Sequence, residues 1–382
     1  MSVLQRRILC LWLVCLACVV STVRAAEDLP FREATFEKGQ LQYVEGIPVL
    51  TVEGTPEEIG RQKAALTLDA VKALSGYPQR LLKLLGREDD WPKMVALGHT
   101  LLPQFPPDHL EELRAFGRTA GVDLDQGLVG NTMVDTYRGG MGCSSLTVDP
   151  VRSATGAPLM GRNLDFYTLG MIDQYTLVTV HRPEGKHAFV VIGYPGMFGC
   201  ISGMNDAGLC VAVHEVYFSR DGSPMFNPKG VPYALCFRKI LEQCTTVEEA
   251  EQLLRETPRT TMLNLAVCDR RGGGVLEMTP KNVVLRRPND GICACTNHFR
   301  SEQLGVLRLC GRYEKLIDCG DQPTLGLAEI AAKLDEVNQG RLTVQTMIFE
   351  PAALRLHLAV GSSPSSALPL KRLDLAERLK PR

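Results

Sequence analysis

The sequence lacks an excess of charge of either sign. Its 382 residues include 42 Lys and Arg and 43 Asp and Glu, which gives a formal net charge of -1, and no run of five like charges occurs. Binding to a nucleic-acid backbone requires a concentrated positive surface, so nucleic acid is not an expected partner. Hydrophobic residues make up 45% and charged residues 22% of the chain, which is typical of a globular protein and excludes a mainly disordered one.

Cysteine pairs at metal-ligand spacing are also missing after the apolar N-terminal stretch. No Cys-x-x-Cys pair occurs among the ten cysteines that follow residue 25, and Cys293-Ala-Cys295 has no second pair to complete a zinc site. We therefore expect neither a metal nor another cofactor. Ten cysteines follow residue 25, and an oxidising compartment would permit disulfides among them. Cys210, Cys236 and Cys268 lie within apolar stretches, however, which favours buried free thiols at these positions.

Long apolar runs are missing except near the beginning of the chain. Arg6 and Arg7 precede an almost wholly apolar stretch from Ile8 to Val23, and Val23-Arg24-Ala25 offers a cleavage site after Ala25. This pattern is typical of a signal peptide, and the stretch is shorter than the roughly 20 residues of a membrane-spanning helix. We expect residues 1–25 to direct export to the periplasm or the medium. Retention of this segment as a membrane anchor is the alternative.

The first half of the exported chain has a helical pattern. Apolar residues recur at three- and four-residue spacing from Pro56 to Leu74 and from Trp91 to Leu102, and a further helix begins at Pro107. Two short apolar segments between Gln42 and Val52 precede these helices. The pattern predicts a mainly helical segment over residues 26–142.

From residue 143 onward the period changes to that of strands. Turn residues separate the segments 144–151, 158–166, 175–180, 187–192, 200–204, 209–216, 263–268, 274–278, 282–285, 343–349 and 354–359. Two helices interrupt them, one over residues 231–243 and one that Thr245 or Thr246 caps, with Glu248 or Glu249 at capping-box distance. This order predicts a second domain over residues 143–382, in which two antiparallel sheets lie between helices in an α/β/β/α sandwich.

The junction of the two halves is the most informative segment. Cys143 follows Gly139, Gly140 and Gly142 and lies at the start of the first strand. Glycine allows unusual backbone geometry, which self-cleavage of a peptide bond requires. If the bond between Gly142 and Cys143 breaks, Cys143 gains an α-amine with an ordinary pKa of about 7.7 to 8, which can act as the base for its own thiol. Such a site needs no catalytic histidine.

Three further motifs follow Cys143 in a characteristic order. They are Gly161-Arg162-Asn163-Leu164-Asp165-Phe166, Gly203-Met204-Asn205-Asp206-Ala207-Gly208-Leu209 and Thr296-Asn297-His298-Phe299. With Cys143 they resemble the N-terminal nucleophile (Ntn) hydrolases. Within that superfamily the chain resembles the acyl-coenzyme A:6-aminopenicillanic acid acyltransferase family, to which choloylglycine hydrolases and acid ceramidase are related. The resemblance spans roughly residues 143–359, and the helical segment before it fits the pro-region of the acyltransferase-like members.

The resemblance implies a catalytic role for each matching residue. Cys143 matches the nucleophile, and Asp165 matches the acid that holds its α-amine. Arg162 matches an arginine beside the nucleophile, where a cation would lower the pKa of the thiol. Asn205 and Asn297 match asparagines whose amides face the developing oxyanion. Arg312, in Gly-Arg-Tyr-Glu-Lys-Leu, is a candidate for a more distant family arginine with a secondary or substrate-binding role.

The resemblance also implies the reaction. Choloylglycine hydrolases expose their cysteine directly, whereas this chain retains 117 residues before Cys143 after loss of the leader, so activation is expected to be proteolytic. We expect the two fragments to stay associated and to cleave a linear amide with an apolar acyl half through a thioester. N-acyl amides, penicillins and N-acyl lipids all remain open as substrates. Candidates to line the acyl pocket are Met197, Phe198, Tyr217, Phe218 and Met225.

Two alternatives from other classes remain. One is a binding protein that has this fold and has lost catalysis. The other is a thiol hydrolase that pairs Cys143 with His214 or His298, although the sequence around Cys143 lacks the papain-type motif.

Overall fold

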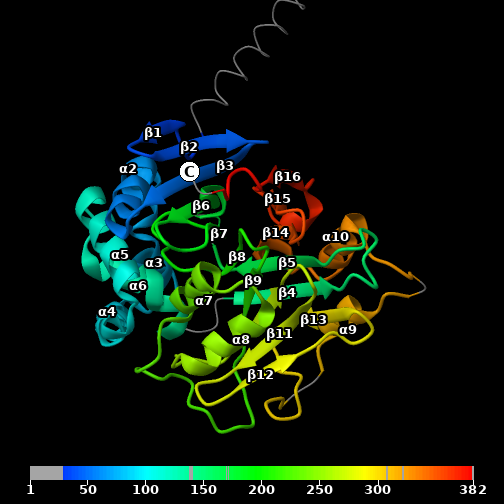
Figure 1. The fold of residues 1–382 in the computed structure, drawn as a ribbon. Coiled ribbons are helices and arrows are strands. Elements are labelled where there is room, and N and C mark those ends of the chain that lie inside the picture. The colour runs from blue at the N-terminus through cyan, green and yellow to red at the C-terminus, as the bar shows by residue number, and fades with distance from the viewer. Residues whose placement is uncertain are drawn as a thin grey trace, which may run out of the picture.

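The computed structural model describes residues 29–136, 141–168, 170, 172–306, 309–320 and 322–380, so the expected signal peptide and its cleavage site lie outside it. Two stacked β-sheets form the centre of the molecule, and helices cover their outer faces (Figure 1). None of the helices in the described ranges is long and apolar enough to cross a membrane.

The first sheet has ten strands in the order β1-β2-β3-β6-β7-β8-β9-β10-β11-β12. Their bounds are Ala34–Phe36, Gly39–Val44, Ile47–Gly54, Leu177–Pro183, Phe189–Gly193, Ser202–Asn205, Cys210–Glu215, Leu263–Cys268, Gly273–Met278 and Val283–Arg286. Neighbours are antiparallel except β3 and β6, which are parallel, so the expectation of purely antiparallel sheets was wrong at this point. Parallel strands need a long connection between them, and the helical segment supplies it.

The second sheet has six strands in the order β13-β4-β5-β14-β15-β16, all antiparallel to their neighbours. Their bounds are Ile292–Cys295, Met141–Val148, Leu159–Phe166, Thr343–Glu350, Arg355–Val360 and Lys371–Asp374. Cys143 therefore lies near the start of β4, a strand that pairs with β13 on one side and with β5 on the other.

Helices form at both outer faces. They span Pro56–Leu74 (α2), Tyr77–Leu84 (α3), Trp91–Leu101 (α4), Pro107–Ala120 (α5), Leu124–Thr136 (α6), Tyr233–Gln243 (α7), Val247–Glu256 (α8), Gly311–Ile317 (α9) and Leu327–Glu336 (α10). The expected cap of α8 is Thr246, whose hydroxyl accepts the Glu249 N–H at 3.2 Å. Thr55 and Glu58 form a reciprocal capping box at the start of α2, which satisfies N–H groups that have no partner within the helix.

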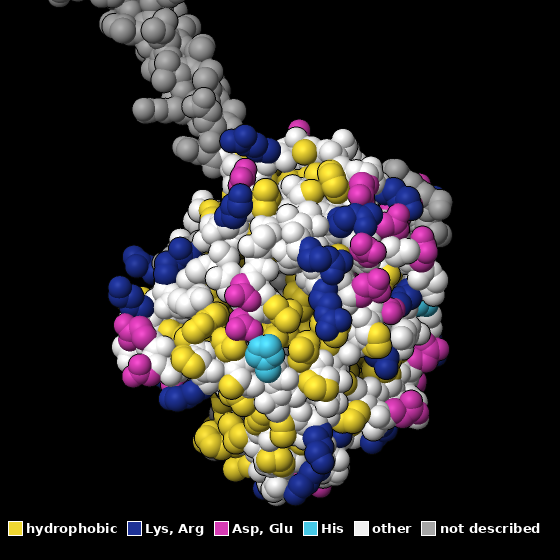
Figure 2. Space-filling model, turned by 90° about the vertical axis from the view of Figure 1, so that its left-hand side faces the viewer, with side chains coloured by type: hydrophobic (Ala, Val, Ile, Leu, Met, Phe, Trp, Pro, Cys, Tyr) yellow, Lys and Arg dark blue, Asp and Glu magenta, His cyan; other side chains and the backbone are white. Residues whose placement is uncertain are grey.

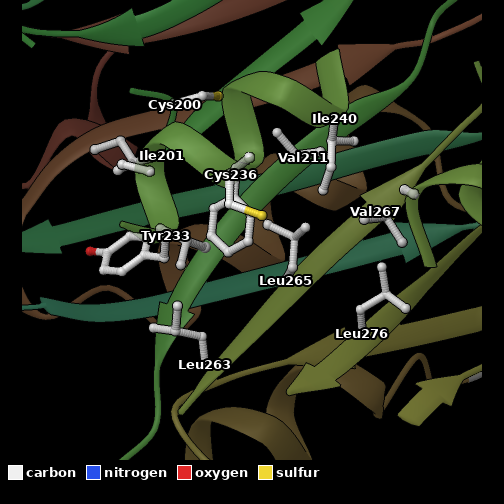
Figure 3. Packing of buried hydrophobic residues seen from close by; sticks show 14 of the residues in the cluster. Cys200, Ile201, Val211, Tyr233, Cys236, Ile240, Leu263, Leu265, Val267 and Leu276 are labelled. Atoms are coloured by element: carbon white, nitrogen blue, oxygen red, sulfur yellow. The ribbon is translucent and has the colours of Figure 1, made fainter. Parts of the chain in front are cut away.

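Alternating side chains build the layers of the core. On β10, Leu263, Leu265 and Val267 pack in the cluster that includes α7 and α8 (Figure 3), whereas Ala266 and Cys268 belong to the cluster between the sheets. A third cluster joins the second sheet to α9 and α10. These clusters define the four layers of an α/β/β/α sandwich, which confirms the expected fold class.

The segment before Cys143 is not a separate layer of the molecule. Its strands β1–β3 extend the first sheet, and a buried ion network links its helices to α7. Glu112 on α5 contacts Lys63 on α2 at 2.9 Å and Arg238 on α7 at 2.6 Å, and Arg238 contacts Glu242 at 2.8 Å. All four side chains are buried, so separating the segment from the sheets would expose charges that now have partners.

Candidate active site

Cys143 is placed by the pairing of β4 with β5. In this register Cys143 lies opposite Leu164 and Gly142 lies opposite Asp165. Alternation along β4 directs Ser144 to the opposite face from Cys143. The side chains of Cys143, Arg162 and Asp165 are fully buried. The Gly-Arg-Asn-Leu-Asp motif thus lies on the strand adjacent to Cys143, and the structure brings together three residues that the sequence singled out.

The sulfur of Cys143 is in contact with a cation. Arg162 Nη2 lies 3.6 Å from Cys143 Sγ, and Nη1 donates to the carbonyl of Val213 at 2.7 Å. Burial raises the pKa of the Cys143 thiol to about 11, and Arg162 opposes this rise only in part. The expected effect of the arginine on the pKa has the right sign, but desolvation outweighs it in the uncleaved chain. The thiol therefore needs a base before it can attack.

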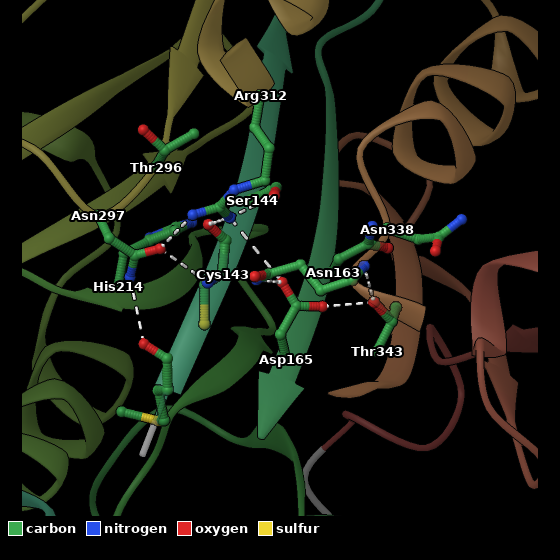
Figure 4. A network of polar contacts seen from close by, with 12 residues as sticks. Cys143, Ser144, Asn163, Asp165, His214, Thr296, Asn297, Arg312, Asn338 and Thr343 are labelled. Carbon is green, nitrogen blue, oxygen red and sulfur yellow. Dashed lines mark hydrogen bonds and ion pairs between the residues drawn. The ribbon is translucent and has the colours of Figure 1, made fainter. Parts of the chain in front are cut away.

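The backbone of Cys143 is held from both sides (Figure 4). Its N–H donates to Asn297 Oδ1 at 3.0 Å, and its carbonyl accepts from Arg312 Nη1 at 2.7 Å. Arg312 Nη2 also donates to Asn297 Oδ1 at 2.8 Å. Arg312 thus belongs to the same site, and it connects Cys143 to the Thr296-Asn297-His298 motif.

The amide nitrogen of Asn297 donates to two carbonyls. It reaches Glu215 O at 2.9 Å and Met141 O at 3.3 Å. Met141 belongs to the segment that cleavage before Cys143 would release. In the uncleaved chain, the predicted oxyanion donor is therefore bound to a carbonyl of that segment.

Asp165 is enclosed by hydrogen-bond donors. Its Oδ1 accepts from the Thr343 hydroxyl at 2.6 Å, its Oδ2 accepts from Gln339 Nε2 at 2.5 Å, and Arg312 Nη1 lies 3.9 Å from Oδ2. Burial raises the pKa of this carboxyl, against the effect of these donors. A raised pKa makes the carboxylate a stronger proton acceptor.

Asn205 does not lie at this site. Its Nδ2 donates to the carbonyls of Leu241 and Cys244 at 3.0 and 2.7 Å, and its Oδ1 accepts the Leu209 N–H at 2.9 Å. These bonds join the β8–β9 turn to the end of α7, so the structure gives Asn205 a structural position. The expected oxyanion role for Asn205 has no support in this geometry.

Neither histidine of the alternative hypothesis contacts the thiol. His214 Nε2 lies 2.8 Å from Ser145 Oγ, and burial together with Arg162 holds the pKa of His214 well below its usual value. The His298 side chain instead hydrogen-bonds to Cys310 and, against the effect of burial, helps to lower the pKa of that thiol to about 6. A catalytic pair of Cys143 with either histidine is therefore not present in this geometry.

Three residues at the site were not predicted from the sequence. Glu215, at the end of β9, accepts the Met141 N–H through Oε2 at 3.2 Å and the Tyr217 hydroxyl at 2.7 Å. Gln339 and Thr343 hold Asp165 through hydrogen bonds. Glu215 lies seven residues after Gly208 in the predicted hairpin, but an acidic residue at a strand end carries no distinctive signal. Gln339 and Thr343 lie outside every motif of the resemblance.

An apolar cavity lies beside the start of β4. Met141, Leu164 and Phe166 form one wall, and α3, α6 and residues 194–197 form much of the rest. A surface groove between α2, α5 and α6 shares lining residues with it, namely Leu74, Pro78, Gly130, Pro195 and Gly196. The shared residues indicate that the cavity opens toward the helical face. Apolar side chains gather on that face (Figure 2), which includes the exposed Leu84, Leu85 and Leu124.

The expected pocket residues divide into two groups. Met197 lines the cavity and Phe198 lines the adjoining groove. Phe218 and Met225 are exposed and line neither, and Tyr217 bonds to Glu215.

The cysteines carry no cross-links in the described ranges. All ten that lie there are free, and Cys210, Cys236 and Cys268 are fully or almost fully buried. Across the same ranges, no three His, Cys, Asp or Glu side chains gather in a way that could hold a metal ion.

A four-layer α/β/β/α sandwich with a cysteine near the start of β4 is the architecture that the resemblance to the Ntn hydrolases implies. Residues 151–312 match the family model of acyl-coenzyme A:6-aminopenicillanic acid acyl-transferase. This match covers less than half of the chain and starts after Cys143, and it confirms the resemblance that the motifs indicated. The match and the fold together support the coarse class, an Ntn hydrolase or acyltransferase.

Comparison with solved structures found distant likenesses. A Caenorhabditis elegans N-acylethanolamine-hydrolyzing acid amidase ortholog has 17% identity and a TM-score of 0.45, over 60% of this chain and 100% of that chain. A variant of the Clostridium perfringens conjugated bile acid hydrolase has 16% identity and a TM-score of 0.45, over 62% and 93%. Penicillin V acylase from Agrobacterium tumefaciens has 16% identity and a TM-score of 0.42, over 62% and 87%. The comparison with curated proteins gave no match.

Proposed function

We propose that this chain is an exported amidohydrolase that activates itself by cutting the bond between Gly142 and Cys143. The processed enzyme then cleaves a linear amide with an apolar acyl group through a thioester on Cys143. The observation that carries the proposal is the arrangement around Cys143, where Arg162 contacts the sulfur and Asn297 and Arg312 hold the backbone nitrogen and oxygen.

This arrangement supports self-cleavage by the following steps. The thiol gives up its proton, for which the buried Asp165 carboxylate is the candidate acceptor, and Sγ attacks the carbonyl carbon of Gly142. The peptide C–N bond breaks, the nitrogen takes up a proton, and a thioester between Gly142 and Cys143 results. Water then hydrolyses the thioester, releases the Gly142 carboxylate and restores the thiol.

Cleavage changes two groups at the site. The nitrogen of Cys143 becomes an amine that can accept the thiol proton, whereas in the intact chain it is an amide that donates to Asn297. Departure of Met141 would also release Asn297 Nδ2 from its carbonyl, so this donor could then face the oxyanion of a substrate. The same segment thus blocks the site before cleavage and exposes it afterwards.

Turnover would use the same chemistry on an external amide. Cys143 attacks the amide carbonyl, Asn297 Nδ2 stabilises the oxyanion, and the leaving amine takes a proton. The apolar cavity beside Leu164 and Phe166 would accept the acyl group, because its lining offers few polar side chains. The thioester can pass its acyl group to water or to another amine. We propose hydrolysis, since an exported enzyme meets water at far higher concentration than an activated acyl donor or acceptor.

The two fragments are expected to remain together. The β3–β6 pairing and the ion network of Lys63, Glu112, Arg238 and Glu242 cross from one fragment to the other and do not involve the cleaved bond. Export rests on the leader alone, and a fusion of residues 1–28 to a reporter enzyme would test it.

Intact mass and N-terminal sequencing of the purified protein test the proposal. We expect fragments of 117 and 240 residues after loss of the leader, the second beginning at Cys143. Cys143→Ala should give one uncut, inactive chain, whereas Cys319→Ala, at a partly exposed cysteine outside the site, should be cut normally.

Processed protein should release amine from N-acyl amides and p-nitroanilides, faster as the acyl group becomes more apolar. A single uncut chain with full activity would contradict the mechanism. Amide cleavage that persists in Cys143→Ala would contradict the assignment of the nucleophile. Tight binding of acyl amides without any turnover or cutting would instead support the inactive binding protein.

A further inference from the structure

The side chain of Gln339 lies against the residue on the acyl side of the proposed cleavage. A β-carbon added to Gly142 would overlap Gln339 Nε2 and would stand 3.3 Å from Cδ and 3.4 Å from Oε1 of the same side chain. The φ angle of Gly142 lies outside the left-handed region, so backbone strain does not explain the need for glycine here. The Gln339 side chain therefore leaves no room for a β-carbon at residue 142, and this steric contact explains the glycine.

Gln339 cannot move aside without a loss of other bonds. Its Nε2 donates to Asp165 Oδ2 at 2.5 Å, and its backbone N–H donates to Thr343 Oγ1 at 2.8 Å. Thr343 Oγ1 in turn donates to Asp165 Oδ1 at 2.6 Å. A side chain that pushed Gln339 away would therefore break a charge-assisted hydrogen bond to the carboxylate beside the nucleophile.

We propose that Gln339 is a specificity-determining residue that restricts the enzyme to acyl groups with an unbranched α-carbon. The inference rests on the proposed function. The thioester of self-cleavage and the thioester of turnover are the same species, an acyl group on Cys143 Sγ beside the α-amine of Cys143. They differ only in the acyl group.

Gly142 is the first acyl group that this sulfur carries. Its α-carbon, which bears two hydrogens, shows where the α-carbon of a substrate acyl group would lie relative to Gln339. A straight-chain acyl group places a CH₂ there and fits. An α-methyl branch in the position of the L-alanine β-carbon, which is the R configuration of a 2-methylalkanoyl group, would meet the same amide nitrogen that an alanine at position 142 would meet.

The first experiment measures self-cleavage in Gly142→Ala, Gln339→Ala and the double variant, each expressed as the full chain. We expect Gly142→Ala to slow cutting by roughly 10- to 200-fold, the range that one misplaced methyl group produces. The double variant should be cut as fast as Gln339→Ala alone, because the clash is gone. Cutting of Gly142→Ala at the parent rate would overturn the inference. The inference would also be overturned if the fold-decrease in the cutting rate of the double variant equalled the product of the fold-decreases of the two single variants.

The second experiment compares kcat/KM for hexanoyl and (R)-2-methylhexanoyl p-nitroanilide on processed protein. Hydroxide-catalysed hydrolysis of the same two anilides measures the difference in their intrinsic reactivity. For the parent enzyme, the ratio of kcat/KM for the unbranched anilide to that for the branched anilide should exceed the corresponding ratio of hydroxide rate constants by roughly 10-fold or more.

Three variants of the processed protein complete this comparison. Gln339→Ala should lose most of the preference for the unbranched anilide. Gln339→Met, which keeps the bulk and removes the donor, should keep the preference while total activity falls. Gln252→Ala, at an exposed glutamine on α8, should match the parent.

The outcomes separate this inference from the proposed function. A parent protein that is uncut and cleaves neither anilide would contradict the function itself. A parent that cleaves hexanoyl anilide through Cys143, with a preference that Gln339→Ala leaves intact, would overturn only the role of Gln339. If Gln339→Ala does not fold, as judged by circular dichroism, Gln339→Ser takes its place in both experiments.

Discussion

Asn297 Oδ1 accepts the backbone N–H of Cys143 at 3.0 Å, so a side chain 154 residues further along the chain holds the nitrogen that cleavage would convert to an amine. The same amide group donates through Nδ2 to Met141 and Glu215. Asn297 thus orients the proposed nucleophile in the intact chain and carries a donor that departure of Met141 would release. This dual position makes Asn297 the most informative residue to replace.

Asn297→Ala should lower kcat of the processed enzyme by roughly 10²- to 10³-fold, the usual loss for one oxyanion donor, with the fold intact. Asn297→Asp should be worse, because it places a carboxylate oxygen where negative charge develops. Steady-state kinetics on processed protein checks both. To obtain processed variants, the two fragments can be expressed separately if cutting is slow. Turnover of Asn297→Ala close to that of the parent would assign Asn297 a structural role only.

Asn205→Ala should behave differently. It removes three buried hydrogen bonds and leaves the carbonyls of Leu241 and Cys244 without this partner, at a cost of about 1 to 3 kcal/mol per unsatisfied group. Urea unfolding should show the lower stability, whereas kcat per folded molecule should stay near that of the parent. A selective loss of kcat at unchanged stability would restore the oxyanion role that the sequence suggested.

Glu112→Gln should destabilise the chain strongly. It leaves the buried Lys63 and Arg238 without their shared carboxylate, and breaking a buried ion pair typically costs about 3 to 5 kcal/mol. Urea unfolding of the uncut Cys143→Ala chain avoids the complication of two fragments. Glu57→Gln is the control: its contacts with Arg61 and Arg118 are exposed, so we expect a change of about 0 to 1 kcal/mol. Equal effects of the two substitutions would contradict a stabilising role of the buried network.

Stability should fall as the pH is lowered below about 6.5. Burial lowers the pKa of His109 and His181, so the folded chain keeps these side chains neutral while the unfolded chain takes up protons near the ordinary value of 6.5. Each such proton decreases the free energy of unfolding by about 1.4 kcal/mol per pH unit. Below about pH 4.5, protonation of Glu112 and Glu242 in the unfolded chain adds to this. Burial alone would raise the pKa of both carboxyls, but Arg238 and the neighbouring cations hold it low.

Urea unfolding of the Cys143→Ala chain between pH 8 and pH 5 measures this slope. His109→Gln should reduce it, because one proton-binding difference between the folded and unfolded chain is lost. A stability that is constant or rises toward pH 5 would contradict neutral burial of these histidines.

Much of the secondary structure was predictable because its causes are local. The strand periods placed β4, β5, β9 and β10 within a few residues of their bounds, and Thr246 caps α8 as its spacing to Glu249 predicts. The helices at residues 327–336 and 311–317 and the strands at 292–295 and 371–374 were not identified, since each is short and its apolar pattern is weak.

The candidate site was partly predictable for a different reason. Cys143, Arg162, Asp165 and Asn297 lie in motifs that carry a family resemblance, and the structure places all four together, with Arg312, around the start of β4. The motif around Asn205 did not indicate the contacts of its side chain, because the amide of a turn asparagine bonds to the segment that packs on the turn, and here that segment is the end of α7.

The sequence by itself determined the elements of this protein, the globular character of the chain and the residue types available for chemistry. The tertiary structure decided which distant segments meet. Gln339 reaches Asp165 across 174 residues, β3 pairs with β6 in parallel, and Glu112 on α5 contacts Arg238 on α7. The hydrophobic periods of strands and helices depend on residues that are neighbours along the chain, so they can be recognised in the sequence. Contacts of this kind depend on how the layers pack, and no local pattern records them.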